Sequence, residues 1–265
     1  MTTTGFHGDR TSKPRRSWPG WCAAAVLAMA AGMSQAAEIK VLTAGAYKSV
    51  LLALAPGFEQ HSGHRLVVDH DTAGALQKRI AGGEPFDLVV LTPAALEAMV
   101  KTGQVAPGPL RLAKVAIGVA VKQGAPLPDI GSVAAFQQAL LAARAVATID
   151  PAAGGCSGIY LWQLFDKMGI AEQLKPRAVL VPGGLVAPRL LNGEADIAIH
   201  QISELMGVPG TTLVGPLPAE IQHYTVYAGG VSAAARDAGA AQALLAWLSG
   251  PQAAAVLQAK GMQAP

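Results

Sequence analysis

Apolar residues along the chain follow two patterns that alternate from about residue 38 onward. Short, nearly continuous apolar runs predict buried strands, and they lie at 38–43, 64–69, 87–92, 144–149, 178–181 and 195–200. Between them, apolar residues at helical spacing predict amphipathic helices, as for Val50, Leu51, Leu54 and Phe58. The regular alternation of strand and helix favours an α/β fold with a largely parallel sheet.

Two more β-type segments, 114–121 and 224–227, stand apart from this alternation. We interpret them as the places where the chain crosses from one lobe to another and returns. The sequence therefore predicts lobe I over residues 37–118 and 224–265, and lobe II over residues 119–223.

The loops that follow the predicted strands consist largely of Gly, Ala, Ser and Thr. They lie at 43–48, 70–75, 92–93, 150–158 and 182–185. Ligands of open parallel sheets bind beyond the carboxyl ends of the strands. Two lobes that meet across such loops would enclose a cleft for a small solute.

The stretch 147–160 predicts a strand, a glycine-rich turn and a helix that begins near Ser157, with Ser157 as its N-cap. A helix N-terminus offers free N–H groups and the positive end of the helix dipole, which together bind anions. We expect Ser157 and Gly158 to donate their backbone N–H groups to the ligand. The alternative, an ordinary strand-to-helix turn without a ligand, stays open, because glycine-rich turns before helices are common.

The first 36 residues have the pattern of a cleaved secretory signal peptide. Four basic residues within 10–16 precede an apolar run at 21–31, and Ser34-Gln35-Ala36 is a small-x-small cleavage site. The apolar run is too short to span a membrane, so we expect a periplasmic protein. The pair Arg15-Arg16 leaves the secretion route, general or twin-arginine, open.

The signal peptide also accounts for the charge of the chain. The formal net charge is +3, and residues 1–36 contain four Lys or Arg and one Asp, so residues 37–265 are formally neutral. A neutral chain without a basic patch argues against nucleic acid or a membrane surface as partner. One cysteine, Cys156, remains after cleavage, so no internal disulfide is expected.

Four motifs carry a resemblance that extends over residues 38–265. They are Leu76–Leu88, Asp150-Pro151 with Ser157–Tyr160, Gly193–Ile197 and Leu248–Ala254. In these motifs the chain resembles the periplasmic molybdate-binding protein family, within the type II solute-binding fold. The resemblance implies two lobes, each a mostly parallel sheet flanked by helices, with the ligand in the cleft between them. It also implies a monomer without cofactor whose partner is the membrane permease of an ABC transporter.

The chain departs from that family at the positions that would hold the ligand. The family's two serine loops correspond here to Gly45-Ala46-Tyr47 and Thr72-Ala73-Gly74. Loss of the serines argues against a tetrahedral oxyanion and favours a larger organic anion with carboxylates. The segments His200–Leu205 and Val214–Pro218 are similar to a divergent branch that includes aconitate isomerases.

Three functions remain open. The first is capture of an organic polycarboxylate for ABC-type uptake, the second is aconitate isomerisation in the same cleft, and the third is molybdate or tungstate binding. The expected ligand-binding residues are Ala46, Tyr47, Lys48, Thr72, Gly74, Thr92, Ser157, Gly158, Gly184 and Gln201.

An isomerase could use His200 or Tyr47 to move a proton. Lys48 could instead be a solvated surface lysine, and His200 a hydrogen-bonded core histidine. The remaining histidines lack the spacing of metal ligands, so no metal site is expected.

Overall fold

The computed structural model describes residues 1, 5, 8 and 36–265, and residues 36–265 form one compact unit. The predicted signal peptide therefore lies almost entirely outside the described residues. Within the described part, no helix combines the length and the apolar character that crossing a membrane requires.

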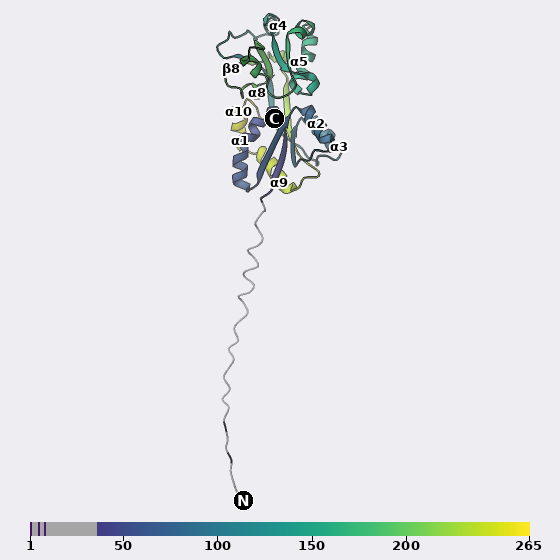
Figure 1. Ribbon diagram of the computed structural model, residues 1–265, viewed down its shortest axis with the longest axis vertical. Coiled ribbons are helices and arrows are strands. Elements are labelled where there is room, and N and C mark those ends of the chain that lie inside the picture. The colour runs from purple at the N-terminus through teal and green to yellow at the C-terminus, as the bar shows by residue number, and fades with distance from the viewer. Residues whose placement is uncertain (2–4, 6–7, 9–35) are drawn as a thin grey trace. The chain divides into compact units, whose positions relative to one another are not determined.

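The first group of strands is arranged around β1 (Glu38–Ala44), at the lower end of the compact unit in Figure 1. Strand β1 pairs in parallel with β2 (Arg65–Asp71) on one side and β3 (Leu88–Leu91) on the other. Strand β9 (Tyr224–Val231) lies antiparallel to β3 and also pairs with the first half of β4 (Leu110–Lys122).

The second group is arranged around β5 (Val146–Ile149). This strand pairs in parallel with β6 (Ala178–Val181) and β7 (Ile197–Gln201). The second half of β4 lies antiparallel to β7 and to β8 (Thr211–Pro216). The carboxyl ends of the parallel strands in this group include residues 149 and 181, directly before the predicted ligand loops at 150–158 and 182–185.

Strand β4 belongs to both groups. Residues 110–116 pair with β9, and residues 117–122 pair with β7 or β8. The hydrogen-bonded path is thus continuous, in the order β2-β1-β3-β9-β4-β7-β5-β6. The change of partner near residue 117 lies beside the predicted boundary between residues 118 and 119, and the lobe boundaries themselves stay a prediction.

Helices cover both faces of the first sheet. They are α1 (Gly45–Ser62), α2 (Ala73–Ala81), α3 (Pro93–Lys101), α9 (Ala238–Leu248) and α10 (Gln252–Ala259). Successive residues of a buried strand point to opposite faces. Accordingly, Leu88 and Val90 of β3 join the core with α1, α9 and α10, whereas Val89 and Leu91 join the core with α2 and α3. Burial on both faces explains why β3 is apolar at every position.

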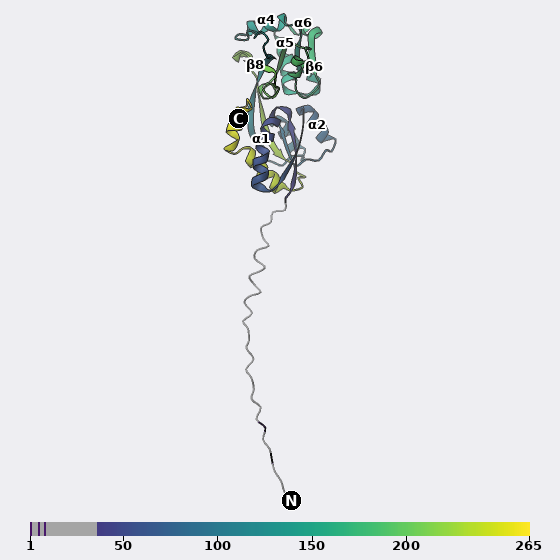
Figure 2. The same ribbon diagram turned by 60° about the vertical axis from the view of Figure 1, so that its left-hand side comes forward.

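The second sheet follows the same rule. Its helices are α4 (Val133–Ala142), α5 (Cys156–Lys167), α6 (Ala171–Leu174), α7 (Pro188–Leu191) and α8 (Ile202–Leu205), with 3-10 turns at Pro151–Ala153, Lys175–Arg177 and Ala219–Ile221. Ile197 and Ile199 of β7 join the core with α4, α5 and α6, and Ala198 joins the core with α7 and α8. Figure 2 shows α4, α5 and α6 together at the end of the unit away from α1 and α2.

The predicted α/β class is confirmed, and some local boundaries are wrong. The loop expected at 43–48 is absent, because β1 extends to Ala44 and α1 begins at Gly45. Helix α5 begins at Cys156 with Gly155 as N-cap, so Ser157 lies inside its first turn and does not cap it.

Candidate functional site

A cavity of about 200 Å³ lies where the loops of the two strand groups meet; we call it the cleft cavity. Its wall is built from strand ends and the residues that follow them. The lining residues are Ala44, Gly45, Ala46, His70, Asp71, Thr72, Ala73, Ile149, Gly155, Cys156, Ser157, Gly183, Gly184, His200, Gln201, Glu204 and Tyr227. None of these lining residues is a lysine or an arginine.

Three helices of eight or more residues begin at the cleft cavity. The first residues or N-caps of α1, α2 and α5 all belong to its wall. Neither α1 nor α5 has a side chain that caps its N-terminus. Their first-turn N–H groups are therefore left for another acceptor, and the aligned dipoles favour a negative charge at this point.

The turns on the two sides of the cavity also bond to each other. The N–H of Gly74 donates to the carbonyl of Gly154 at 3.1 Å, and the hydroxyl of Thr72 donates to the carbonyl of Ala153 at 2.5 Å. A Cβ on Gly74 would lie 2.8 Å from Cα of Gly154, closer than real contacts allow. Glycine is thus required at this contact for the turns to approach.

A histidine and a glutamate lie together in the wall. His200 is the last residue but one of β7, and Glu204 follows four residues later in α8, with Nδ1 of His200 3.1 Å from Oε2 of Glu204. Their side chains are only 4% and 11% exposed. The two groups are in contact, but Nδ1 makes no hydrogen bond of good geometry, so neither group is well satisfied by the other.

Burial moves the pKa values of these two groups in opposite directions. It raises the pKa of Glu204 to about 8, against the weaker lowering effect of Lys48, and it lowers the pKa of His200 to about 3. Each shift favours the neutral form, because a charge inside the protein loses its hydration. Near neutral pH the pair therefore contains a proton that can be given up to a base.

On the far wall, Tyr227 and Gln201 form a short hydrogen-bonded chain. The Tyr227 hydroxyl donates to Oε1 of Gln201 at 2.9 Å, and Nε2 of Gln201 donates to the hydroxyl of Thr225 at 3.1 Å. Burial raises the pKa of Tyr227 well above its ordinary value. The chain of hydrogen bonds fixes the side chain of Gln201 in the wall, and burial keeps Tyr227 as a neutral phenol.

Six of the residues predicted from the sequence line the cleft cavity: Ala46, Thr72, Ser157, Gly184, His200 and Gln201. Their roles in binding stay a prediction, and two of them also have a place in the framework. The Thr72 hydroxyl accepts from the Ala75 N–H at 3.1 Å while it donates to Ala153, so it caps α2 and joins the two turns. Ser157 is almost fully buried, at 2% exposure.

Tyr47 and Lys48 lie outside the wall. Tyr47 belongs to α1, and its side chain is fully buried in the core. The expectation that it lies in a loop is therefore wrong. Burial raises its pKa. Lys48 lies close to the cavity, where its Nζ is 2.9 Å from Nε2 of His70, a lining residue.

Gly74, Thr92 and Gly158 act in the framework. Gly74 makes the turn contact described above, and Thr92 caps α3 by accepting from the Ala95 N–H at 3.4 Å. A Cβ on Gly158 would lie 2.4 Å from the carbonyl oxygen of Ile149. Gly158 therefore lets α5 pack against β5, and a larger residue there would disturb the fold itself.

Sequence reasoning missed Glu204, Tyr227, His70, Asp71 and Cys156. For Glu204 a signal existed, because positions 200 and 204 are four apart and face the same side once a helix begins between them. For Cys156, burial raises the pKa of the thiol, so it lines the wall as a neutral group. Among residues 36–265, no group of three or more His, Cys, Asp or Glu side chains could hold a metal ion.

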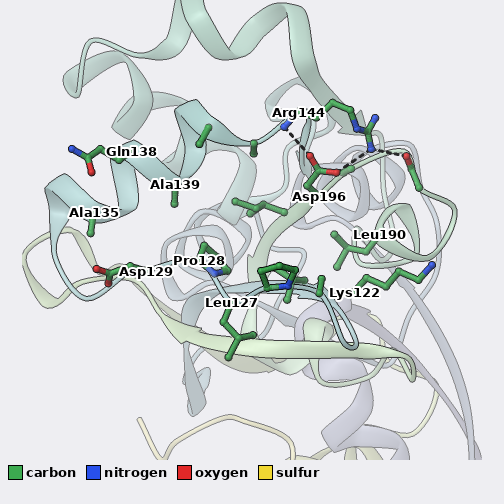
Figure 3. Close-up of a pocket in the computed structure, with 18 residues that line it drawn as sticks. Lys122, Leu127, Pro128, Asp129, Ala135, Gln138, Ala139, Arg144, Leu190 and Asp196 are labelled. Carbon is green, nitrogen blue, oxygen red and sulfur yellow. Dashed lines mark hydrogen bonds and ion pairs between the residues drawn. The ribbon is translucent and has the colours of Figure 1, made fainter.

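A second, larger hollow of about 730 Å³ lies between α4 and the segment after β4 (Figure 3). Its wall is mainly alanine, leucine and proline, and Arg144 stands at its edge. The guanidinium of Arg144 is already bonded to Asp196 at 3.0 Å and to the carbonyl of Gly193 at 2.8 Å. The hollow shares no lining residue with the cleft cavity, which is the better candidate for an anion.

Comparison with known proteins gives consistent relatives. A family model described as bacterial extracellular solute-binding protein matches residues 39–263. An aconitate isomerase from Pseudomonas sp is 34% identical over 232 residues, which cover 85% of this chain and 87% of that protein. The molybdate-binding protein ModA of Azotobacter vinelandii is 28% identical over 260 residues, which cover 89% of this chain and 95% of that protein.

The fold has a counterpart among solved structures. The periplasmic molybdate-binding protein of Azotobacter vinelandii superposes with a TM-score of 0.73 at 20% identity, covering 86% of this chain and 99% of that one. At this identity the likeness concerns the fold alone, and it confirms the two-lobed type II architecture predicted from the sequence.

Proposed function

The chain belongs to the bacterial extracellular solute-binding protein family, and we propose that its cleft cavity captures a small organic anion with more than one carboxylate. The observation that carries this proposal is the convergence of α1, α2 and α5 on one cavity, with the N-termini of α1 and α5 uncapped by side chains. Several separate groups of N–H donors suit an anion whose charges lie on separate carboxylates.

The size and chemistry of the wall favour an organic ligand over a tetrahedral oxyanion. Since a water molecule occupies about 30 Å³ in the liquid, a cavity of about 200 Å³ has room for several waters. The hydroxyl of Thr72, which could have bound an oxyanion, is already bonded on both sides. We further propose that the protein works in the periplasm and delivers its ligand to the permease of an ABC transporter.

A binding panel tests this proposal. Purified protein without the first 36 residues is titrated calorimetrically with trans-aconitate, cis-aconitate, citrate, molybdate and sulfate. We expect the polycarboxylates to bind and to raise the melting temperature, with a stabilisation that grows with the logarithm of their concentration over Kd. Stabilisation by molybdate alone would overturn the organic-anion proposal.

A matched pair of variants locates the site. A Cβ on Gly183 meets no atom closer than 3.8 Å, so Gly183→Val adds bulk to the wall without a clash. We expect this variant to keep its melting temperature and to lose at least tenfold in affinity. Gly239→Val, at an exposed position in α9, is the control with normal binding.

A second candidate function is isomerisation of a bound unsaturated polycarboxylate, as in the 34% identical aconitate isomerase. The contact between His200 and Glu204 favours it, because an allylic shift needs a group that takes a proton from one carbon and returns it to another. The electron pair moves along the three-carbon unit, so no oxidant is needed. N–H donors at the carboxylates would stabilise the charge that develops.

Proton NMR separates the two candidates. Protein is mixed with cis-aconitate and the trans isomer is followed with time. Turnover by the wild-type protein that disappears in Glu204→Gln would support the enzyme. Tight binding with no interconversion would leave the capture function and exclude the isomerase.

A further inference from the structure

Glu204 holds an unusual place for a carboxyl group, because it lies in the wall of the cleft cavity against the first residue of α1. A Cβ on Gly45, the first residue of α1, would lie 2.7 Å from Oε1 of Glu204. The other oxygen, Oε2, is the one in contact with His200. An ionised Glu204 would therefore compete with an anionic ligand at the start of α1.

No cation neutralises Glu204 by direct contact within residues 36–265. The nearest candidate, Lys48, is hydrogen-bonded to His70, and its charge reaches Glu204 only at longer range. Nδ1 of His200 is buried without a hydrogen-bond partner. The pair is thus a buried acid and a buried base in contact with each other.

One proton decides the net charge of this pair. A neutral histidine with a protonated glutamate, and a protonated histidine with a glutamate anion, both sum to zero. Loss of the proton leaves one negative charge in the wall of an anion site. The two arrangements of the proton therefore lead to the same expectation for ligand binding.

We propose that the cleft binds its anion only while the His200–Glu204 pair retains its proton, so that anion capture and proton retention are linked. This inference rests on the proposed function, since it concerns the same cavity and an anionic ligand. It makes Glu204 a residue that determines when the ligand is held, and it predicts release under alkaline conditions.

The sign follows from the two equilibria. Burial raises the pKa of Glu204 to about 8 in the empty protein. A bound anion favours the protonated pair and raises this pKa further. Affinity is therefore full below the pKa of the empty pair, and it falls about tenfold per pH unit above it until the pKa of the occupied pair is reached.

Other titratable groups face the pair from each neighbouring element. They are Lys48 on α1, His70 and Asp71 at the end of β2, Cys156 on α5 and Tyr227 on β9. Burial raises the pKa values of Cys156 and Tyr227. Burial, followed by the charge of Lys48, lowers the pKa of His70 from its ordinary 6.5, so His70 titrates in a more acidic range than the pair.

Calorimetry with trans-aconitate as the probe tests the linkage. Titrations from pH 6 to 9.5 in two buffers of different ionisation enthalpy give both Kd and the number of protons taken up. We expect uptake that approaches one proton per ligand above pH 8, with Kd rising about tenfold per pH unit. The proton count needs no variant, so it stands even if a substitution at Glu204 disturbs folding.

Three variants assign the effect. Glu204→Gln should bind with the same Kd at pH 6 and pH 9.5, because its amide cannot ionise. His70→Gln and Cys156→Ser should keep the alkaline loss of affinity. A wild-type Kd that is flat from pH 6 to 9.5, or a Glu204→Gln profile as steep as the wild type, overturns the linkage but leaves polycarboxylate binding intact. Absence of binding to every polycarboxylate at every pH overturns the proposed function instead.

Discussion

Glu84 and Glu204 are the same side chain in opposite surroundings. Glu84 accepts from Nε and Nη2 of Arg79 at 2.6 and 2.8 Å and from Nζ of Lys40 at 2.8 Å. These hydrogen bonds, those from Arg79 first, lower its pKa to about 2. Glu204 has no such cation, and burial raises its pKa to about 8. The pKa of a carboxyl group therefore depends more on its surroundings than on its residue type.

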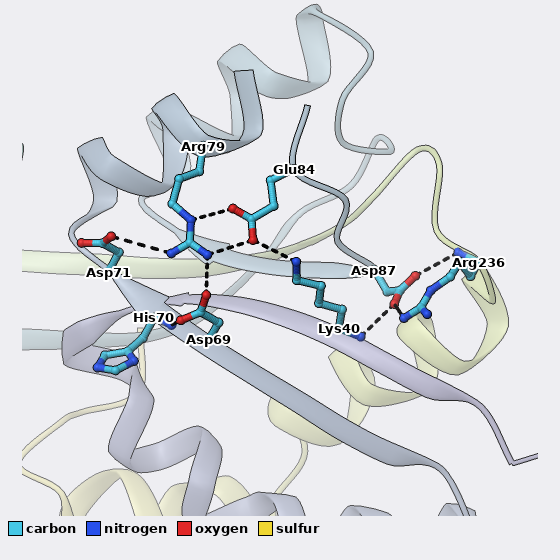
Figure 4. A network of polar contacts seen from close by, with 8 residues as sticks. All are labelled: Lys40, Asp69, His70, Asp71, Arg79, Glu84, Asp87 and Arg236. Atoms are coloured by element: carbon cyan, nitrogen blue, oxygen red, sulfur yellow. Dashed lines mark hydrogen bonds and ion pairs between the residues drawn. The ribbon is translucent and has the colours of Figure 1, made fainter. Parts of the chain in front are cut away.

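The surroundings of Glu84 extend into a network of charges at the sheet edge (Figure 4). Arg79 lies between Glu84, Asp69 and Asp71, with its Nη1 3.7 Å from Oδ2 of Asp71. Asp71 also lines the cleft cavity. The molecule thus keeps carboxylates paired with cations at the edge and, in the cleft, a carboxyl group whose contact is a neutral histidine, although the two regions adjoin.

The largest effect should come from Glu204→Gln, which removes this carboxyl group. Because its folded pKa is raised above the ordinary 4.5, its stabilising effect is complete below pH 4.5 and is lost as the pH rises through about 8. The wild-type protein should lose on the order of 5 kcal/mol across that range from this group. Urea unfolding at several pH values should show a flatter profile for the variant. Equal slopes for both proteins would contradict a neutral Glu204.

Asp87→Ala tests a paired carboxylate that is also buried. Asp87 accepts from the N–H of Lys40 at 2.8 Å and from the N–H and Nη2 of Arg236 at 2.9 and 2.8 Å. Its side chain is 3% exposed, so the substitution leaves buried donors unmatched and should cost about 2 kcal/mol. Asp166→Ala, at an exposed position, is the control with little change.

The pH dependence of that loss has the opposite sign from that of Glu204. Burial acts to raise the pKa of Asp87, but the hydrogen bonds from Arg236 and Lys40 outweigh it and the pKa is lowered. The stabilisation is therefore present above the ordinary pKa of 3.8 and is lost as the pH falls below it. A gap between the two proteins that persists unchanged at pH 2 would argue against a charged Asp87.

Arg79→Ala removes the cation that three carboxylates share. Since these side chains are partly exposed, solvent screens the pairs and the loss should be about 1 kcal/mol. The loss should shrink as the salt concentration rises from about 0.05 to about 1 M, because dissolved ions screen the remaining attraction between Arg79 and the carboxylates. Arg79→Lys, which keeps the charge but not the forked geometry, should fall between the two. A loss independent of salt would point to packing of the arginine stem.

The smallest effect should come from Glu84→Gln. Its side chain is 22% exposed, and we expect the free energy of unfolding to change by about 0.5 kcal/mol, a difference that disappears as the pH falls toward 2.

Carbon NMR of the carboxyl groups sharpens the comparison directly. The signal of Glu84 should titrate near pH 2 and that of Glu204 near pH 8. Two similar midpoints would remove the contrast on which these predictions rest.

The sequence was sufficient for the layers of the fold, because apolar runs such as Leu88–Leu91 directly reflect burial on both sides. It also located the glycine-rich turn before α5. These features depend on neighbours along the chain, and local pattern is what a sequence displays.

The parts that were missed depend on register and on where helices begin. Lys48 meets His70 because Thr43 pairs with His70 across β1 and β2, a relation between distant segments. Glu204 faces His200 only because α8 begins directly after β7. The sequence pattern predicted the strand but not the short helix that follows it. Tyr47 was misplaced because the small residues before it allow a helix to start, not a loop to bend.

The contact between Gly74 and Gly154 bears on how long a ligand stays in the cleft cavity. The hydrogen bonds from Gly74 to Gly154 and from Thr72 to Ala153 hold the two turns against each other. If each bond contributes about 0.5–1.5 kcal/mol, the turns would be separated for only roughly one part in five to one part in a hundred of the time. A ligand that can leave only during those intervals has a dwell time governed by the protein as well as by its own affinity. The pace at which cargo or product emerges would then depend on two residues that carry no side chain.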